Sequence, residues 1–531
     1  MKVFQAISDA VKSEEVQVAF ALMGDANQNL IVDLGERHGI KIVNFRHEQN
    51  AVAAADGYAR FSDGKLGVAL VTAGPGLTNT ATSLVAARVH RSPVLVFAGA
   101  TSVGELHSPQ RFDQVAFSRL LAGAGAVLES PGSLAVQLDL AFGRVRRQSG
   151  PFVLNLPSNI QNANAPEDWS YRPGYSGYQP TLPSGGALSA AARILAEARS
   201  PAILAGRGAV RGRAATSISK LASYLQAPIA STLPAKGLCS DHPLWVGVSG
   251  GLGEGLALPC LAASDVLLVA GASLNQWTTH HGDMTKGKVI LQIDADLEAF
   301  GNFARADVVL NGDTRETVQA LLDCVRQCVP SERNTNARLQ KKIEIEWQNF
   351  NSLISYEICA EGTIDPRQAV QEINRLLPAD RLVVAAGGHA GYLVCQMLKV
   401  NSPENWNYTI DFGALGQGLA TAIGAAFARP GQRVYHLTGD GEFMMNLSDF
   451  HTTVAYKLPM TVIILNDQGF GQERHDLGHK NLPIKYAMQA SPDFARLAEG
   501  FGGAASASIR LIAFLVSQRR YKVQKPSKDP L

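Results

Sequence analysis

Two short motifs in the last third of the chain carry oxygen ligands at a fixed spacing. The tripeptide GDG around Asp440 is separated by 24 residues from Asn466, and the apolar run Met460–Leu465 leads directly into that asparagine. Mg²⁺ prefers hard oxygen ligands in near-octahedral geometry and commonly keeps phosphate oxygens in its shell. The Asp440 carboxylate, the Asn466 amide oxygen and the main-chain carbonyl of Gln468 would supply three ligands. The pattern therefore predicts a site for a magnesium ion and a diphosphate.

The residues beside Asp440 suit a phosphate. Gly441 allows close approach of the backbone, and a helix expected to start near Glu442 would offer free N–H groups to an anion. Either motif alone is more often an ordinary turn at the end of a strand. The two motifs together, at this spacing, favour the metal site.

Further ionisable side chains stand outside the metal motifs. Glu48 stands at the start of a predicted helix, Glu48–Arg60, where an acid is also favoured by the helix dipole alone. Asp25 lies in a turn, GDANQNL, and Glu473 follows Asn466 in the segment NDQGFGQE. His475 is a further candidate, although an isolated histidine is more often structural.

The elements that must position these residues alternate between short apolar runs and helical patterns, which is typical of parallel sheets covered by helices. Glycine clusters follow strands in the first and last blocks, at the strand ends where α/β sheets bind ligands. We therefore expect an α/β fold with three doubly wound parallel-sheet domains. The predicted strands are Val16–Met23, Lys41–Asn44, Leu66–Thr72, Pro93–Ala98, Ala202–Ala205, Val266–Ala270, Val289–Ile293, Leu382–Ala385, Arg433–Leu437 and Met460–Leu465.

Composition sets the predicted domain boundaries and excludes several classes. Two segments separate the predicted domains: a proline-containing linker at 164–184 and a charged helical stretch, Ser331–Tyr356. The predicted domains are 1–163, 185–330 and 357–503, and an atypical tail follows at 504–531. The formal charge is +2 without a basic stripe, so no nucleic-acid partner is expected. The six cysteines are scattered and argue against a disulfide framework or zinc. With no signal peptide or membrane span visible, a cytoplasmic protein is expected.

The segment GDGEFMMNLSDFHTTVAYKLPMTVIILND, residues 439–467, resembles the signature of the thiamine-diphosphate enzyme superfamily, which includes acetolactate synthase, pyruvate decarboxylase and benzoylformate decarboxylase. The resemblance runs from about residue 3 to about residue 503. It implies a pyrimidine-binding first domain, a central domain and a diphosphate-binding third domain, with thiamine diphosphate and Mg²⁺ as cofactors. It also implies a 2-oxo acid substrate and active sites shared between the subunits of a homodimer, which could pair into a homotetramer.

Several segments match the family residue by residue. FRHEQNAVAAADGYAR resembles the helix whose glutamate, here Glu48, touches the aminopyrimidine ring, and TAGPGLTN resembles the loop lining the pyrimidine pocket. FGALGQG resembles the loop whose bulky residue, here Leu415, bends the cofactor, while GGHAG resembles a turn on the diphosphate. Leu415 could instead belong to the core. The cofactor-binding residues implied are Pro75, Asn79, Gly387, Gly388, His389, Gly413, Leu415, Asp440, Gly441, Glu442, Asn466 and Gln468.

The reaction is predicted from the same resemblance. Asp25 and Glu473 match acids of pyruvate and indolepyruvate decarboxylases, although two extra residues stand before Leu30. Gln114 matches a substrate-loop glutamine of acetolactate synthase, or it simply faces solvent. GASLNQW lacks the arginine expected beside flavin, which argues against FAD. We therefore predict a 2-oxo acid decarboxylase with carboligase activity as a possibility, and an acetolactate synthase-like carboligase as the first alternative.

A second alternative is a protein that binds the cofactor without turnover. The family continues beyond about residue 502 with a helix and an apolar strand that complete the third sheet. This chain instead ends in SQRRYKVQKPSKDPL, and the preceding IRLIAFLVS could form a replacement strand or helix. A missing strand would leave a sheet edge exposed and could impair folding.

Overall fold

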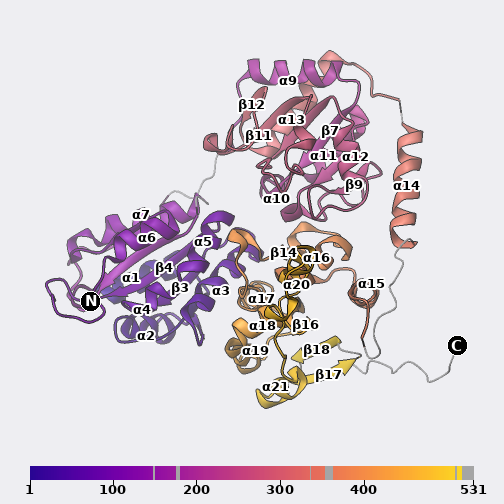
Figure 1. Cartoon of the computed structure of the whole chain (residues 1–531). Helices are drawn as coiled ribbons and strands as arrows, with labels where there is room; N and C mark the ends of the chain where they lie inside the picture. Colours follow the sequence, from indigo (N-terminus) through magenta and orange to yellow (C-terminus); the bar gives the residue numbers. More distant parts are fainter. Residues whose placement is uncertain (148–149, 175–179, 335, 353–362, 509–510, 517–531) are drawn as a thin grey trace. The chain divides into compact units, whose positions relative to one another are not determined.

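The computed structural model describes residues 1–147, 150–174, 180–334, 336–352, 363–508 and 511–516. The chain divides into two compact units (Figure 1). The first unit combines Met1–Gly174 with the segment from Ile410 onward, and the second unit is Tyr175–Thr409.

A six-stranded parallel sheet with the strand order β2-β1-β3-β4-β6-β5 forms the amino-terminal part of the first unit. Helices α1 (Val3–Ser13), α2 (Gln28–Glu36) and α7 (Leu134–Arg146) share a hydrophobic core with one face of this sheet. Helix α3 (Glu48–Phe61) packs against β1, β3 and β4, while α5 (Ala81–His90) packs against α3. The strands are β1 (Val18–Ala21), β2 (Lys41–Asn44), β3 (Gly67–Val71), β4 (Val94–Ala100), β5 (Gly125–Val127) and β6 (Phe152–Pro157).

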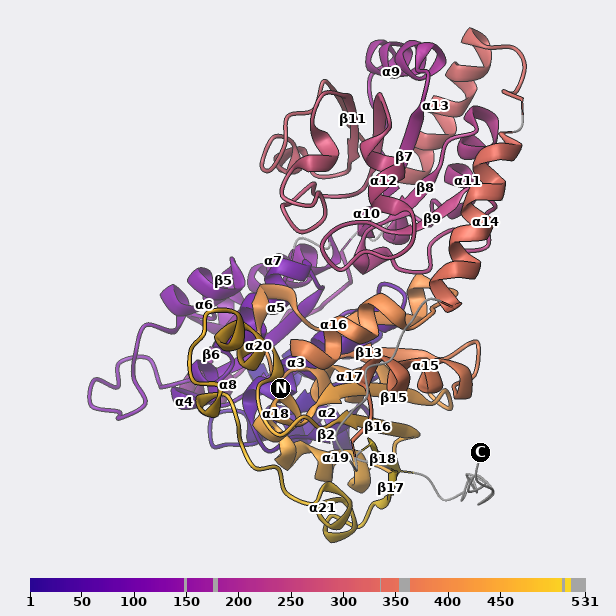
Figure 2. The same cartoon turned by 45° about the vertical axis from the view of Figure 1, so that its right-hand side comes forward.

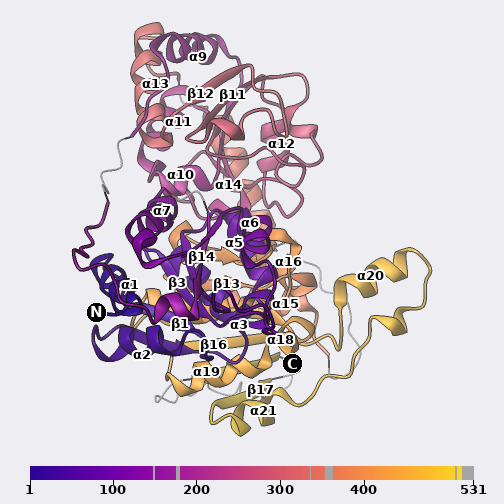
Figure 3. The same cartoon turned by 90° about the vertical axis from the view of Figure 1, so that its left-hand side faces the viewer.

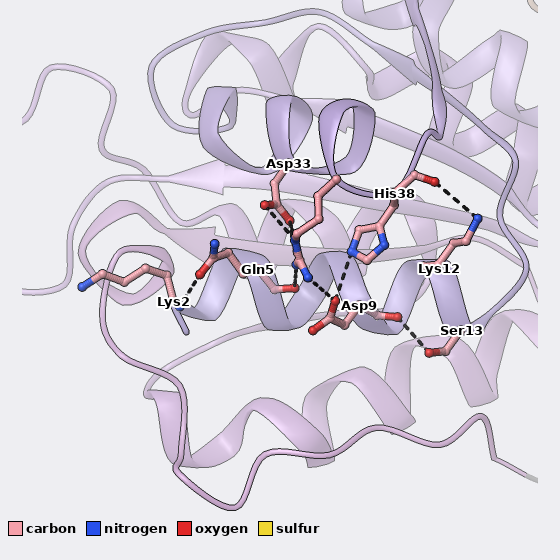
Figure 4. A network of polar contacts seen from close by, with 8 residues as sticks. Lys2, Gln5, Asp9, Lys12, Ser13, Asp33 and His38 are labelled. Carbon is pink, nitrogen blue, oxygen red and sulfur yellow. Dashed lines mark hydrogen bonds and ion pairs between the residues drawn. The ribbon is translucent and has the colours of Figure 1, made fainter.

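Polar contacts join α1 to the end of α2 at the surface (Figure 4). Arg37 forms ion pairs with Asp9 at 2.6 Å and with Asp33 at 2.8 Å, and it also donates to the Gln5 carbonyl. His38 lies 3.0 Å from the Asp9 carboxylate. Exposed pairs of this kind are worth about 0–1 kcal/mol each, so this network orients two helices more than it stabilises the fold.

The second unit contains a central parallel sheet with the order β12-β11-β10-β7-β8-β9. In β7 (Pro201–Ala205), Ile203 and Ala205 face a core shared with α9, α11 and α13, whereas Ala202 and Leu204 face a core shared with α12 and α14. This alternation is what two covered faces require. The other strands are β8 (Ile229–Ser231), β9 (Trp245–Val248), β10 (Val266–Ala270), β11 (Val289–Asp294) and β12 (Val308–Asn311), and the helices are α9 (Gly185–Glu197), α11 (Ala215–Leu225), α12 (Ala257–Ala262), α13 (Thr314–Cys328) and α14 (Ala337–Ser352).

Helix α14 runs along the central sheet domain (Figure 2), where the Trp347 ring stacks on Trp245 with centroids 4.9 Å apart. The same unit holds the parallel strands β13 (Leu382–Ala385) and β14 (Trp406–Tyr408), with helices α15 (Pro366–Leu376) and α16 (Gly388–Met397). Lys236 is buried within this unit and donates to Glu254 at 2.9 Å and to the Cys395 carbonyl at 2.8 Å.

The carboxyl-terminal part of the first unit is built on β15 (Val434–Gly439) and β16 (Met460–Leu465), which pair in parallel. Strand β18 (Leu511–Val516) pairs antiparallel with β16 and with β17 (Ala504–Ser508). The helices are α17 (Gly418–Ala428), α18 (Asp440–Met445), α19 (Phe450–Ala455), α20 (Gly471–His479) and α21 (Phe494–Gly500). Figure 3 shows the segment around α20 standing away from the strands of this part.

The hairpin of β17 and β18 shows how the atypical segment after Gly503 contributes to the sheet. In the first sheet, the neighbouring strands β5 and β6 are connected through α7 and run parallel, whereas only residues 509 and 510 separate β17 from β18. A connection this short can join only antiparallel strands. The segment IRLIAFLVS therefore supplies a strand that pairs with β16 along Met460–Leu465, and residues 517–531 lie outside the described part of the chain.

The predicted arrangement of three α/β domains with parallel sheets is confirmed, and the terminal hairpin is its antiparallel exception. Each predicted strand is present within two residues at either end. The helix expected near Glu442 begins two residues earlier, at Asp440. Helix α14 occupies part of the predicted stretch Ser331–Tyr356, whose residues 335 and 353–356 lie outside the described part. Among the described residues, no helix is long and apolar enough to span a membrane.

Candidate cofactor site

Asp440 lies at the carboxyl end of β15, as the first residue of α18. Its buried carboxylate accepts hydrogen bonds from the backbone N–H groups of Gly469 (3.0 Å) and Asp467 (3.4 Å), and from the Ser491 hydroxyl. Burial raises the pKa of the Asp440 carboxyl. Because β15 and β16 are parallel neighbours, the Asp440 carboxylate and the turn after β16 meet at the same edge of the sheet, as the spacing predicted.

The turn after β16 carries the other two predicted metal ligands. The Asn466 side-chain oxygen accepts from the Gln468 N–H at 3.0 Å, and the Gln468 carbonyl accepts from the Gln489 N–H at 2.8 Å. Gln468 adopts φ 59°, in the left-handed region that few side chains favour. The hydrogen bond from Gln489 thus holds this turn in place.

These residues fit Mg²⁺ and a diphosphate on two grounds. The ligand atoms predicted at Asp440, Asn466 and Gln468 are all oxygens, which is the donor set that Mg²⁺ selects. A Cβ atom at Gly441 would lie 3.0 Å from the Gly469 carbonyl oxygen and from the Phe470 ring, so a side chain at residue 441 would crowd the turn against α18. The metal-binding roles themselves stay predictions.

The loop that carries Gly413 and Leu415 is hydrogen-bonded to α18. Glu442 is buried, and its Oε1 accepts from the Gly418 N–H at 3.2 Å, at the start of α17. Asn446 donates its side-chain N–H to the Gly416 carbonyl. Leu415 is half-buried, so it is not a core residue, and it remains accessible for the predicted contact with the cofactor.

Glu48 lies beside the predicted pyrimidine loop. It is the first residue of α3 with 8% of its surface exposed, and its Oε2 accepts from the Asn79 side chain at 3.0 Å. Pro75 begins the short helix α4 (Pro75–Thr78) in the same loop. A Cβ at Gly76 would lie 3.7 Å from Glu48 Oε1. The structure therefore brings together the residues assigned from FRHEQNAVAAADGYAR and TAGPGLTN.

The Gln114 side chain is hydrogen-bonded to the backbone at the start of this loop. Its Oε1 accepts from the Gly74 N–H at 3.1 Å, and its Nε2 donates to the Gly99 carbonyl and to Asn155 Oδ1, each at 2.9 Å. The side chain is buried, so the solvent-facing interpretation is wrong. Its predicted catalytic role stays a prediction, and the contacts give it a supporting position.

The remaining predicted residues fall in three places. Gly387, Gly388 and His389 form the start of α16 in the second unit, with Gly388 at φ 69°. Asp25 is exposed and lines a small hollow with the polar side chains of Asn29, Ser158, Gln161 and Asn162. Glu473 and His475 are exposed on α20. The roles of all these residues stay predictions.

The packing of α3 on α17 is a feature that the sequence reasoning missed. The two helices cross at glycines: a Cβ at Gly57 would lie 2.3 Å from the Thr421 carbonyl oxygen, and one at Gly424 would lie 2.1 Å from the Ala54 carbonyl oxygen. The available signal was the row of small residues in AVAAADG and LATAIGAA. This crossing places the helix that begins at Glu48 directly on the helix that follows the Leu415 loop.

Polar contacts hold both ends of α3 as well. At its start, Asp449 accepts from the Asn50 side chain at 2.5 Å and from the Arg46 N–H at 2.8 Å. At its end, Arg60 pairs with Asp56 on α3 and with Asp411 ahead of the Leu415 loop. The Arg60–Asp56 pair has ordinary helical i, i+4 spacing, but the pairings with Asp449 and Asp411 join partners hundreds of residues apart and do not follow from local spacing.

Comparison with known families agrees with this architecture. The N-terminal TPP binding domain of thiamine pyrophosphate enzymes matches residues 1–117, the central domain matches residues 188–321, and the C-terminal TPP binding domain matches residues 386–515. The chain belongs to the thiamine-pyrophosphate-dependent enzyme superfamily.

Three individual relatives align with more than nine-tenths of this chain. Sulfoacetaldehyde acetyltransferase of Castellaniella defragrans is 28% identical, with 94% of this chain and 86% of the relative covered. The large subunit of acetolactate synthase isozyme 3 of Escherichia coli is 28% identical, with 92% and 86% covered. A probable acetolactate synthase large subunit of Methanococcus aeolicus is also 28% identical, with 94% and 86% covered.

Proposed function

We propose that this protein binds thiamine diphosphate and Mg²⁺ and breaks and forms a carbon–carbon bond next to the carbonyl of a 2-oxo acid. The observation that carries the proposal is the meeting of Asp440 with the turn at Asn466–Gln468 at the carboxyl ends of β15 and β16. When bound, thiamine diphosphate supplies a nucleophilic ring carbon that adds to a carbonyl group.

The side chains of this chain have distinct tasks in the proposal. Asp440, Asn466 and the Gln468 carbonyl hold the metal, which neutralises the diphosphate. Glu48 hydrogen-bonds the pyrimidine ring through the carboxylate that Asn79 orients at 3.0 Å. Leu415 is held on a loop with hydrogen bonds at Gly416 and Gly418, and it sets the shape of the bound cofactor.

For the overall reaction we place transfer of a two-carbon unit to an acceptor first. The names of the relatives support this order, since acetolactate synthase and sulfoacetaldehyde acetyltransferase both describe reactions of an acetyl group, and each alignment covers more than nine-tenths of this chain. This order reverses the one predicted from Asp25 and Glu473 alone. It keeps the same cofactor and the same class of substrate.

Non-oxidative decarboxylation with release of an aldehyde is the second candidate. Asp25 and Glu473 favour it, because acids at these positions match those of the pyruvate and indolepyruvate decarboxylases. A carboxylic acid near the reacting carbon could protonate it and so release the aldehyde.

One assay separates the two candidates. Purified protein is incubated with thiamine diphosphate, Mg²⁺ and a panel of 2-oxo acids, with and without acceptors such as a second 2-oxo acid or inorganic phosphate. Transfer predicts carbon dioxide release accompanied by a condensed or acylated product and little free aldehyde. Stoichiometric aldehyde would establish the decarboxylase instead. Asp440→Ala serves as the inactive control.

A cofactor-binding protein without turnover is the remaining alternative. The pairing of β18 with β16 supports an intact sheet, since the edge of β16 is covered along its length within the described residues. Calorimetric titration with cofactor, run beside the product assay, distinguishes the two. Binding without any product from the whole panel would support the inactive alternative.

A further inference from the structure

Arg60 forms a buried bridge between the two parts of the first unit. Its Nε and Nη2 donate to the two carboxylate oxygens of Asp56, one turn earlier on α3, at 2.8 and 2.6 Å. Its Nη1 donates to Asp411 at 2.6 Å. The side chain of Arg60 is 5% exposed, that of Asp56 2% and that of Asp411 19%. The two-pronged bond to Asp56 stays within α3, whereas the third contact joins Arg60 to Asp411, which lies outside that helix.

Asp411 stands immediately before a strained residue. Phe412 adopts φ 65° although it is not glycine, and its side chain is 58% exposed, so its own packing does little to hold that conformation. Backbone strain of this kind persists only where the surroundings impose it, and it concentrates at functional sites. Gly413 follows at φ 69°, with its N–H bonded to the Ile410 carbonyl at 2.7 Å.

Hydrogen bonds hold the chain on both sides of Leu415. Glu442 in α18, the helix that begins at Asp440, holds Gly418, and Asn446, the residue that follows this helix, holds Gly416. Asp411 is held by Arg60 from α3, the helix that begins at Glu48. The loop of Gly413 and Leu415 is therefore fixed at one end by the helix of the proposed metal site and at the other end by the helix of the proposed pyrimidine contact.

We infer that Arg60 is a positioning residue that acts through Asp411 to hold the Gly413–Leu415 loop in its cofactor-binding conformation. The inference rests on the proposed function, because Gly413 and Leu415 matter only if thiamine diphosphate binds there. Without the Arg60–Asp411 pair, Phe412 relaxes toward a negative φ, and the Gly413 carbonyl and Leu415 side chain leave their places. The cofactor then has to restore the strained loop when it binds.

The charges around Arg60 offer a matched pair of variants. Asp411→Asn leaves Arg60 paired with Asp56, and Asp56→Asn leaves it paired with Asp411, so each variant keeps one buried cation beside one carboxylate. Each variant removes one of the two carboxylates beside Arg60 and should lower the melting temperature of the cofactor-free protein. Only Asp411→Asn cuts the link to the loop. Asp411→Glu restores the carboxylate and should recover part of the loss.

The test is calorimetric titration of each full-length variant with thiamine diphosphate in excess Mg²⁺, together with the near-ultraviolet circular dichroism of the bound cofactor. We expect Asp411→Asn to weaken cofactor affinity about tenfold, as loss of a buried charge-assisted hydrogen bond implies. We also expect it to change the dichroism of the bound cofactor. Asp56→Asn should stay within about twofold of the wild type, with the wild-type spectrum.

The outcomes are distinguishable from failure of the proposed function. If wild-type protein does not bind thiamine diphosphate, the proposed function fails. If wild-type protein binds and the two asparagine variants show equal affinity and equal spectra, Arg60 has a structural role only, and the inference is overturned.

Discussion

Replacing Gly424 by alanine should separate α3 from α17. A Cβ at this position would lie 2.1 Å from the Ala54 carbonyl oxygen and 2.6 Å from the Tyr58 nitrogen, both of which are backbone atoms of α3. Real Cβ atoms essentially never come closer than 3.0 Å to other heavy atoms, so the helices must move apart locally by about 0.9 Å. No side-chain rotation can relieve a contact with backbone.

The expected magnitude comes from two opposing effects. Alanine is favoured over glycine inside a helix by about 1 kcal/mol, which would stabilise the variant. Overpacking of a close-packed interface costs about 1–3 kcal/mol and more where backbone must shift. Because α17 is buried along almost its entire length, we expect a net loss of about 2 kcal/mol in the free energy of unfolding, or roughly 2–3 °C in melting temperature for a chain of this size.

The assay is differential scanning calorimetry of the cofactor-free protein, with Gly478→Ala as the control. Gly478 also lies inside a helix, α20, but nothing stands within 4 Å of its added Cβ. The control should be neutral or slightly stabilised by its helix propensity. If Gly424→Ala melts at or above the wild-type temperature, or if both variants are destabilised equally, the close packing of α3 on α17 is refuted.

Three further predictions concern single contacts. Asn79→Ala removes the donor to Glu48 and should lower kcat about tenfold, with the melting temperature unchanged within error; equal activity would show that the contact does not orient Glu48. Lys236→Met leaves the buried Glu254 carboxylate without its ammonium partner and should cost about 3–5 kcal/mol, and a second change, Glu254→Gln, should restore most of the lost melting temperature. Burial raises the pKa of the Asp449 carboxyl above its ordinary value of 3.8, so the contribution of this group to stability falls as the pH rises from 3.8 through the native pKa. Asp449→Asn should therefore make the melting temperature depend less on pH across the mildly acidic range. An unchanged profile of melting temperature against pH would contradict this.

Local patterns were sufficient for the elements and for the ends of the strands that carry the site. Buried parallel strands read as short apolar runs, and the runs at Val266–Ala270, Leu382–Ala385 and Met460–Leu465 have the same bounds in the structure. Asp440 and Asn466 follow two such runs directly. Their meeting at one sheet edge was predictable because parallel neighbours end on the same side.

Contacts between distant segments were not predictable in the same way. Arg60 and Asp411 lie 351 residues apart, and neither belongs to a periodic pattern that would single it out. The amide of a glutamine such as Gln114 can hydrogen-bond either to water or to protein groups, so its residue type does not predict burial. Gln114 is buried because Gly74, Gly99 and Asn155 supply its partners.

The central claim is that Asp440 and the turn after β16 hold a magnesium ion and the diphosphate of thiamine diphosphate. The most direct test is calorimetric titration of the full-length protein with thiamine diphosphate, with Mg²⁺ present and after its removal by a chelator. The same titrations are run on Asp440→Ala and on Asp168→Ala, the same change at an exposed aspartate. Saturable binding that requires Mg²⁺, survives in Asp168→Ala and is lost in Asp440→Ala is the predicted result. Binding that is unchanged by the chelator, or equal in the two variants, would contradict the claim.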